Sequence, residues 1–359
     1  MNTFNAASKH MTSAEREELF DEFRARLIFE MTQLTRDHSH PTAGPISEFL
    51  RNLPTLQWNS KVLGSQLAER LYDATAKQTP GRRDNFSTAW RPTRFEDYTQ
   101  EWFLTTCKSL HIAPILHRKI WEEVYVVNTL ENAGKLAPGM RGICFGVGQE
   151  RLPAYFASRG ARVLGTDLAP SNQDAASWIN TDQHGSLEKL FHEDLVTKDQ
   201  FDSLVEFQYA DMNNISPALH GQFDFCWSIC AFEHLGSIEN GLRFVENSGK
   251  LLKAGGIAVH TTEYNYSSND QTIDNWGTVL FRRKDFESLA ERLINGGYRI
   301  PSLDFDVGST PMDQFIDVPP YPGHRSFLDS NLSPLHLKLL VDGFPATCFG
   351  LNFSRGSRD

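Results

Sequence analysis

The sequence lacks the features that mark membrane, secreted or nucleic-acid-binding proteins. No apolar run approaches the roughly 20 residues of a transmembrane helix, and the N-terminus has no apolar core of a secretory signal. Lysine and arginine form no basic stripe, and the 359-residue chain has a net charge of −10. This charge disfavours contact with phosphate backbones or anionic membranes. We therefore expect a cytoplasmic protein with neither nucleic-acid nor membrane partners.

Cysteine is scarce. The five cysteines are scattered and odd in number, which fits reduced thiols better than a disulfide framework. Cys226 and Cys230 are four residues apart, but no second pair of zinc-finger spacing accompanies them. We therefore expect no structural zinc site.

The first part of the chain reads as helical. Apolar residues recur at three- and four-residue spacing over residues 12–35, 46–77, 96–110 and 114–134, with a break expected near Pro54. We predict a helical N-terminal region over residues 1–135. This region is too long for a tail. We expect it to be a cap or lid of the acceptor site, or to make the contact of a possible homodimer.

From residue 136 to residue 359 the pattern changes. Apolar runs alternate with helical patterns at about 150–159, 171–180, 185–192 and 237–253, which is typical of a parallel sheet with helices on both faces. The last part adds two strand-like runs, RIPSLDFDV and FPATCFGLNF, that suggest antiparallel strands at the sheet edge. We predict an α/β fold with a doubly wound, mostly parallel, seven-stranded sheet. The expected parallel strands are 142–145, 162–166, 205–209, 223–228 and 257–262.

Two glycines follow the first expected strand. Gly146 and Gly148 permit a tight turn and a close ligand approach. A dinucleotide site would need a third glycine at position 151, which is arginine, so an NAD-linked enzyme is disfavoured. Asp167 ends the second strand, where a carboxylate can accept both ribose hydroxyls. The pattern favours a ligand that carries adenosine without a pyrophosphate, although a plain strand-to-helix turn also gives G-x-G.

Several segments in order resemble the class I S-adenosylmethionine-dependent methyltransferases. They are FGVGQE (145–150), VLGTDL (163–168), YADMNN (209–214), FDFCWSICAFEHL (223–235) and LLKAGGIAVHTT (251–262). The resemblance implies a Rossmann-like fold and S-adenosyl-L-methionine as cofactor. It also implies a cofactor site made of Gly146, Gly148, Glu150, Asp167, Leu168, Asp211, Met212 and Ser228. In this set Asp211 and the backbone of Met212 would meet the adenine.

Two positions depart from the family pattern. The family commonly has an acidic residue two positions before the first glycine, where this chain has Cys144. It often has a small residue where this chain has Glu150. Glu150 either replaces the missing carboxylate near the methionine amino group or is a surface carboxylate in the first turn of a helix.

Methyl transfer to a hydroxyl requires a base that removes the proton. Glu233 and His234 follow the fourth strand and face the cofactor side, so they are candidate catalytic residues or fix the helix entrance. His260 is unusual inside a buried strand and is either catalytic or a core histidine with its hydrogen bonds satisfied. Its neighbour in this strand, Glu263, should point to the opposite face.

The acceptor site is expected near the end of the fifth strand and in the long segment 308–326. We predict that Glu263, Tyr264, Asn265, Tyr321 and His324 bind the substrate, although the segment could equally cover the sheet edge. His260, Glu263 and His324 lack the spacing of a metal signature, so we expect no metal.

The sequence therefore predicts an S-adenosylmethionine-dependent methyltransferase. The polar residues around the expected acceptor site favour O-methylation of a small molecule or glycan. An N-methyltransferase of a small molecule, or a non-catalytic binding protein on the same fold, are the alternatives.

Overall fold

The computed structural model describes residues 45–76, 85–172, 183–319 and 335–356, together with positions 21, 22, 24–27, 29, 175, 179 and 321. The chain divides into two compact units, 1–63 with 318–333, and 64–317 with 334–359. Helix α3 (Pro45–Ala76) continues through Pro54, where the sequence predicted a break. A proline removes one helical hydrogen bond and need not end the helix. The boundary predicted after residue 135 stays a prediction.

The second unit is built on one mixed sheet. Its order is β1-β9-β6-β5-β2-β3-β4, and β2 to β6 run parallel to one another while β9 is antiparallel to β6. The main strands are β2 (Arg141–Phe145), β3 (Arg162–Asp167), β4 (Val205–Tyr209), β5 (Phe223–Ile229), β6 (Leu252–Asn265) and β9 (Phe344–Arg355). The predicted α/β, mostly parallel, Rossmann-like fold is confirmed.

The predicted number of seven strands is wrong, because the sheet has nine strands within the described residues. Three short strands pair with successive parts of β9: β8 (Leu339–Val341), β1 (Arg91–Pro92) and β7 (Tyr298–Arg299). These three strands lie end to end along the same edge of β9. The sheet is therefore seven strands wide although it contains nine strands within the described residues. Strands of two or three residues are too short for an alternation pattern to reveal them.

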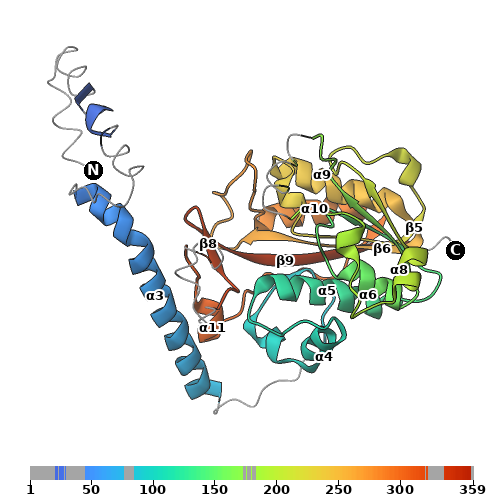
Figure 1. Cartoon of the computed structure of the whole chain (residues 1–359), viewed down its shortest axis with the longest axis horizontal. Coiled ribbons are helices and arrows are strands. Elements are labelled where there is room, and N and C mark those ends of the chain that lie inside the picture. The colour runs from blue at the N-terminus through green and yellow to red at the C-terminus, as the bar shows by residue number, and fades with distance from the viewer. Residues whose placement is uncertain are drawn as a thin grey trace. The chain divides into compact units, whose positions relative to one another are not determined.

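Helices cover both faces of the sheet (Figure 1). On one face lie α4 (Glu101–Ser109), α5 (Arg118–Asn132), α6 (Leu152–Ser158) and α8 (Lys198–Leu204). On the other lie α9 (Ile238–Ser248) and α10 (Arg283–Asn295). Successive side chains of β5 point to opposite faces of the sheet. Phe225 and Trp227 belong to the apolar core under α4, α5, α6 and α8, and Cys226 belongs to the core under α9 and α10.

Some local predictions differ from the structure. Helix α10 was not predicted, and the pattern at 185–192 gives only a 3-10 turn at Glu188–Leu190. The helix expected at 96–110 is divided into a 3-10 turn (Phe95–Thr99) and α4. The predicted helix at 171–180 lies largely outside the described residues, as does most of that at 12–35.

His260 lies in the centre of β6 with no exposed surface. Its Nδ1 is 2.8 Å from the Ser228 hydroxyl and its Nε2 is 2.9 Å from the Ser248 hydroxyl. Both ring nitrogens therefore have partners inside the core, as expected for the core-histidine alternative.

We expect a chain that begins at residue 136 not to fold. Trp121 and Tyr125 of α5 are fully buried, and a Cβ on Gly350 of β9 would lie 2.5 Å from the Tyr125 ring. Removing α5 would therefore expose an apolar sheet face. Circular dichroism melting of the truncated chain is the measurement. A soluble fragment that unfolds cooperatively would contradict this expectation.

Stability should depend on pH through His260. Burial lowers the pKa of His260 to about 3, whereas an unfolded histidine titrates near 6.5. Between these values only the unfolded chain binds the proton, so the free energy of unfolding falls as pH drops from about 6.5 to 3.

In His260→Asn this dependence should weaken by about 1 kcal/mol per pH unit between about pH 6 and 4. Urea unfolding of wild type and variant across this range measures it. Parallel pH profiles for the two proteins would show that His260 is not the titrating group.

Candidate functional site

The glycine turn after β2 has the geometry that glycine requires. Gly146 and Gly148 have φ values of 61° and 51°, in the left-handed region. A Cβ on Gly146 would lie 2.8 Å from the Cβ of Ala231. The turn after β2 therefore touches the turn after β5, at the carboxyl ends of adjacent strands, which is where α/β sheets bind ligands.

Asp167 lies beside this turn. Its Oδ2 accepts hydrogen bonds from the amides of Gly148 and Gly185, at 3.1 Å and 2.8 Å, and its Oδ1 accepts from the Leu168 amide at 2.8 Å. These bonds fix the carboxylate at the end of β3. The Ala210 amide donates to the Asp167 carbonyl at 2.9 Å, which brings the following residues, Asp211 and Met212, to the same edge.

Asp211 and Met212 differ in their surroundings. Asp211 Oδ1 accepts from the Asn213 amide at 2.8 Å and shapes the turn after β4. Met212 is buried, and its Sδ lies 3.8 Å from the position of a Cβ on Gly146. The predicted adenine-side residues therefore adjoin the glycine turn.

Glu150 is directed inward, beside the position where the family usually has a carboxylate. Its Oε2 accepts from the Trp227 indole at 2.9 Å and lies 3.8 Å from the Cys144 thiol. Burial raises the pKa of Glu150 well above its usual value, and the Trp227 hydrogen bond opposes part of this rise. Arg151 instead points away from the site, with its Nε donating to the Leu110 carbonyl.

Helix α5 brings a group of charged side chains to the ends of β5 and β6. Arg118 Nη2 lies 2.6 Å from Glu263 Oε1, and both side chains are buried. Lys119 Nζ is 3.5 Å from Glu122 Oε1 and 3.9 Å from Glu263 Oε1. Glu122 Oε2 accepts from the Thr261 hydroxyl at 2.5 Å. We call Arg118, Lys119, Glu122, Cys230 and Glu263 the charged cluster.

Cys230 is the central residue of the charged cluster. Its φ of 43° is unusual for a residue other than glycine, and such strain is concentrated at functional sites. Its thiol donates to Glu122 Oε2 at 2.8 Å and lies 3.8 Å from Glu263 Oε1. Burial, with Glu122 next, raises the pKa of this thiol well above its usual value. The thiol is therefore a hydrogen-bond donor and not a thiolate nucleophile.

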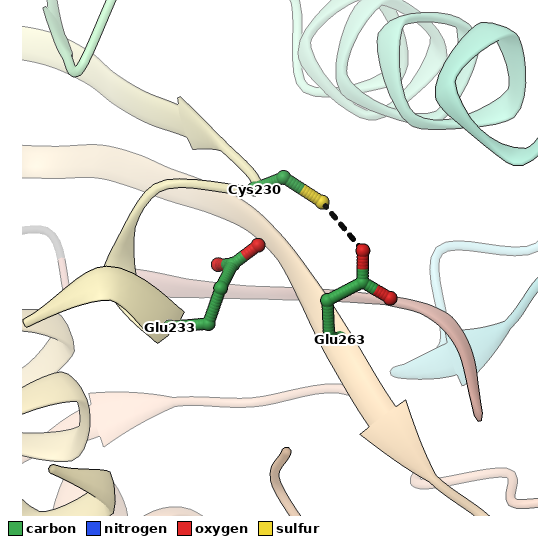
Figure 2. Close-up of side chains that lie close together, drawn as sticks. All are labelled: Cys230, Glu233 and Glu263. Atoms are coloured by element: carbon green, nitrogen blue, oxygen red, sulfur yellow. Dashed lines mark hydrogen bonds between the residues drawn. The ribbon is translucent and has the colours of Figure 1, made fainter. Parts of the chain in front are cut away.

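Cys230, Glu233 and Glu263 offer three metal-ligand atoms within 4.8 Å of one another. Figure 2 shows the Cys230 thiol directed at one oxygen of Glu263, with Glu233 coming from the turn after β5. That same oxygen forms the ion pair with Arg118, and Lys119 lies next to it. A divalent ion would meet these two cations at close range. We therefore assign no metal to this group.

The predicted catalytic pair follows β5. Glu233 is buried and accepts from the Thr262 hydroxyl at 3.0 Å. His234 Nδ1 is 3.0 Å from the Gly277 carbonyl, and its Nε2 is 3.9 Å from Glu233 Oε1. The structure thus brings the two side chains near each other.

The remaining predicted residues are distributed more widely. Ser228 is held by His260 in the core, as described above. Tyr264 packs on Phe286 and Phe349, and Asn265 binds the Gln271 carbonyl at 3.0 Å. Tyr321 belongs to the other unit, where Lys61 Nζ lies 5.6 Å from its ring centre, and His324 lies outside the described residues.

The contribution of α5 to the site was not predicted from the sequence. The signal was present in RKIWEEVYVV, where Glu122 and Glu123 interrupt an otherwise apolar helix face. Burial raises the pKa of Glu123 to about 7. Adjacent acidic residues in a helix are usually solvated, so only the fold reveals that Glu122 is buried and Glu123 half-buried.

Residues 143–260, from β2 to β6, match the family described as a methyltransferase domain. No curated protein matches the chain significantly.

Similar crystal structures include an S-adenosylmethionine-dependent methyltransferase from Mesorhizobium loti, with 15% identity, 64% of this chain and 96% of that chain covered, and a TM-score of 0.36. Another from Clostridium acetobutylicum has 11% identity, coverage of 71% and 98%, and a TM-score of 0.37. The [4+2]-cyclase SpnF has 15% identity, coverage of 76% and 100%, and a TM-score of 0.41.

Among the described residues no helix has both the length and the apolar character needed to cross a bilayer. The segment from β2 to β6 carries the family match and has the strand order and glycine turn expected for it. Residues 143–260 are accordingly similar to a methyltransferase domain, and they lie on a Rossmann-like sheet.

Proposed function

We propose that the protein transfers the methyl group of S-adenosyl-L-methionine to a hydroxyl of a small molecule or glycan. The observation that carries this proposal is the charged cluster beside the glycine turn. It supplies carboxylate oxygens and cationic donors next to the end of β5. Such a lining suits a polar acceptor whose hydroxyl must be oriented and deprotonated.

For the cofactor, we assign the ribose to Asp167 and the adenine side to Asp211 and Met212. The bonds that hold Asp167 beside Gly148 support this assignment. Glu150 stands in for the carboxylate missing at position 144, because its Oε2 lies 3.8 Å from the Cys144 thiol. We propose that it faces the amino group of the methionine part.

Two alternatives have specific support. The carboxylates Glu122, Glu233 and Glu263 outnumber the cations Arg118 and Lys119, which would suit an amine acceptor and N-methylation. The substitution of Cys144 for the usual acidic residue would suit a protein that binds the cofactor without catalysis.

Methyl-labelled S-adenosylmethionine, supplied with a panel of catechols, phenols, sugars and amines, distinguishes these functions. We expect label in hydroxyl acceptors. Label confined to amines would favour the N-methyltransferase. Binding of S-adenosylhomocysteine without any labelled product would favour the binding protein.

Asp167→Ala should weaken S-adenosylhomocysteine binding by about 1–3 kcal/mol, because charge-assisted hydrogen bonds to the ribose are lost. Isothermal titration calorimetry measures the change. Asp202→Ala is the matched control, since Asp202 lies exposed on α8 and pairs with Lys198 of the same helix. Unchanged affinity in Asp167→Ala would remove this residue from the cofactor site.

A further inference from the structure

We infer that Glu122 of α5 is the general base that removes the proton of the acceptor hydroxyl. The inference rests on the proposed function, and it assigns a catalytic role to a residue of the N-terminal helical region. The structure supports it through the position of Glu122, its unequal oxygens and the charges around it.

Glu122 lies close to the glycine turn although it is distant in sequence. Its Oε2 accepts from the Cys230 thiol at 2.8 Å. Ala231, the next residue, is the one that a Cβ on Gly146 would approach to 2.8 Å. Only the turn after β5 therefore separates Glu122 from the turn that we assign to the cofactor.

The two oxygens of Glu122 have different surroundings. Oε2 is fixed by Thr261 and Cys230, one from β6 and one from the turn after β5. Oε1 is buried and has no hydrogen-bond partner among the described residues. Lys119 Nζ, 3.5 Å away, is its ion-pair partner. Apart from this ion pair Oε1 accepts no hydrogen bond within the described part of the chain, so an acceptor hydroxyl is a natural partner for it.

Glu263 has the same feature on the facing strand. Its Oε1 pairs with Arg118, while its Oε2 is buried without a hydrogen-bond partner among the described residues. Arg118 Nε is also buried and unpartnered within this part of the chain. Three unsatisfied polar atoms from two elements therefore gather in the charged cluster, which is expected of a site that a polar ligand completes.

The surroundings shift the pKa values of Glu122 and Glu263 in opposite directions. Burial raises the pKa of Glu122, and Lys119 and Arg118 oppose only part of this rise. Burial would also raise the pKa of Glu263, but Arg118 and Lys119 outweigh it and the net shift is downward. Pairs driven apart in this way identify acid and base roles. Glu263 stays ionised, and Glu122 is the group that exchanges a proton.

Other titratable groups also act on Glu122. Helix α5 contributes Arg118, Lys119 and Glu123, and β6 contributes Glu263. The other groups that interact with Glu122 electrostatically are Glu150 before α6, Cys230 after β5, Cys348 of β9 and Tyr98 of the 3-10 turn before α4. The pH profile of turnover therefore reports the whole group, and only its change on substitution reports Glu122.

The predicted pair Glu233 and His234 is less suited to this role. Glu233 is bound by Thr262, and the His234 ring is turned toward Gly277 and Thr278, with Nδ1 3.0 Å and 3.1 Å from their oxygens. Glu233 thus joins the turn after β5 to β6, and His234 joins the same turn to the 277–278 segment.

The chemical step balances with groups already named. The hydroxyl oxygen attacks the sulfonium methyl carbon and forms the C–O bond, while the C–S bond breaks and its electron pair stays on sulfur. The hydroxyl proton passes to Glu122 Oε1. The products are the methyl ether, neutral S-adenosylhomocysteine and protonated Glu122, which then loses its proton to solvent.

The test is Glu122→Gln, which retains an oxygen for Thr261 and removes the base. With an aliphatic alcohol or sugar acceptor identified by methyl labelling, kcat should fall by about 10²-fold or more. Affinity for S-adenosylhomocysteine should change by less than about threefold. In wild type kcat should rise with pH as Glu122 loses its proton, and this rise should disappear in Glu122→Gln. A nitrophenol, which is ionised at assay pH, should show a much smaller defect.

Two variants complete the experiment. Glu131→Gln is the matched control, since Glu131 lies near the end of the same helix and binds Tyr155 and Arg159; its turnover should equal wild type. Glu122→Asp retains a carboxylate and should keep the pH-dependent rise at reduced kcat, even if the Gln variant is unstable.

Normal turnover and an unchanged pH profile in Glu122→Gln would overturn the inference and leave the proposed function intact. Loss of the pH-dependent rise in His234→Ala, with Glu122→Gln unaffected, would assign the base to His234. A wild-type protein that methylates no hydroxyl probe would instead overturn the proposed function.

Discussion

The ion pair between Arg118 and Glu263 fixes the arrangement of the candidate site. It joins the first turn of α5 to the end of β6 at 2.6 Å, with both side chains buried. Removing one partner of such a pair leaves an uncompensated buried charge, which costs about 3–5 kcal/mol. Because Lys119 and Glu122 belong to the same turn of α5, this pair also sets their positions over β5 and β6. The N-terminal helical region thereby contributes side chains to the same sheet edge as the glycine turn.

The departures from the family pattern compensate for one another. Cys144 lacks a charge, but Glu150 places its carboxylate beside it and is held there by the Trp227 indole. Arg151 stands where a dinucleotide fingerprint would have its third glycine, and its side chain leaves the turn and binds the Leu110 carbonyl near the end of α4. The side chains of Glu150 and Arg151 thereby tie the glycine turn to neighbouring elements.

Alternating apolar runs were sufficient to predict β2 to β6, because a buried parallel strand has a continuous apolar signature. The positions of Gly146, Gly148 and Asp167 at strand ends followed from the same pattern. The contribution of Glu122 could not be predicted, because it depends on how α5 packs against the sheet. Its hydrogen-bond partner Cys230 is 108 residues away in the sequence. The satisfied environment of His260 depends likewise on Ser248, from another helix.

The central claim is that the glycine turn and the charged cluster form one site. A crystal structure with S-adenosylhomocysteine bound tests it most directly. The account predicts the ribose on Asp167, the adenine beside Met212 and the thioether sulfur facing the turn at Cys230, with Glu122 across from it. Ligand density with the sulfur directed away from α5, or an adenosine that does not touch Asp167, would contradict the account.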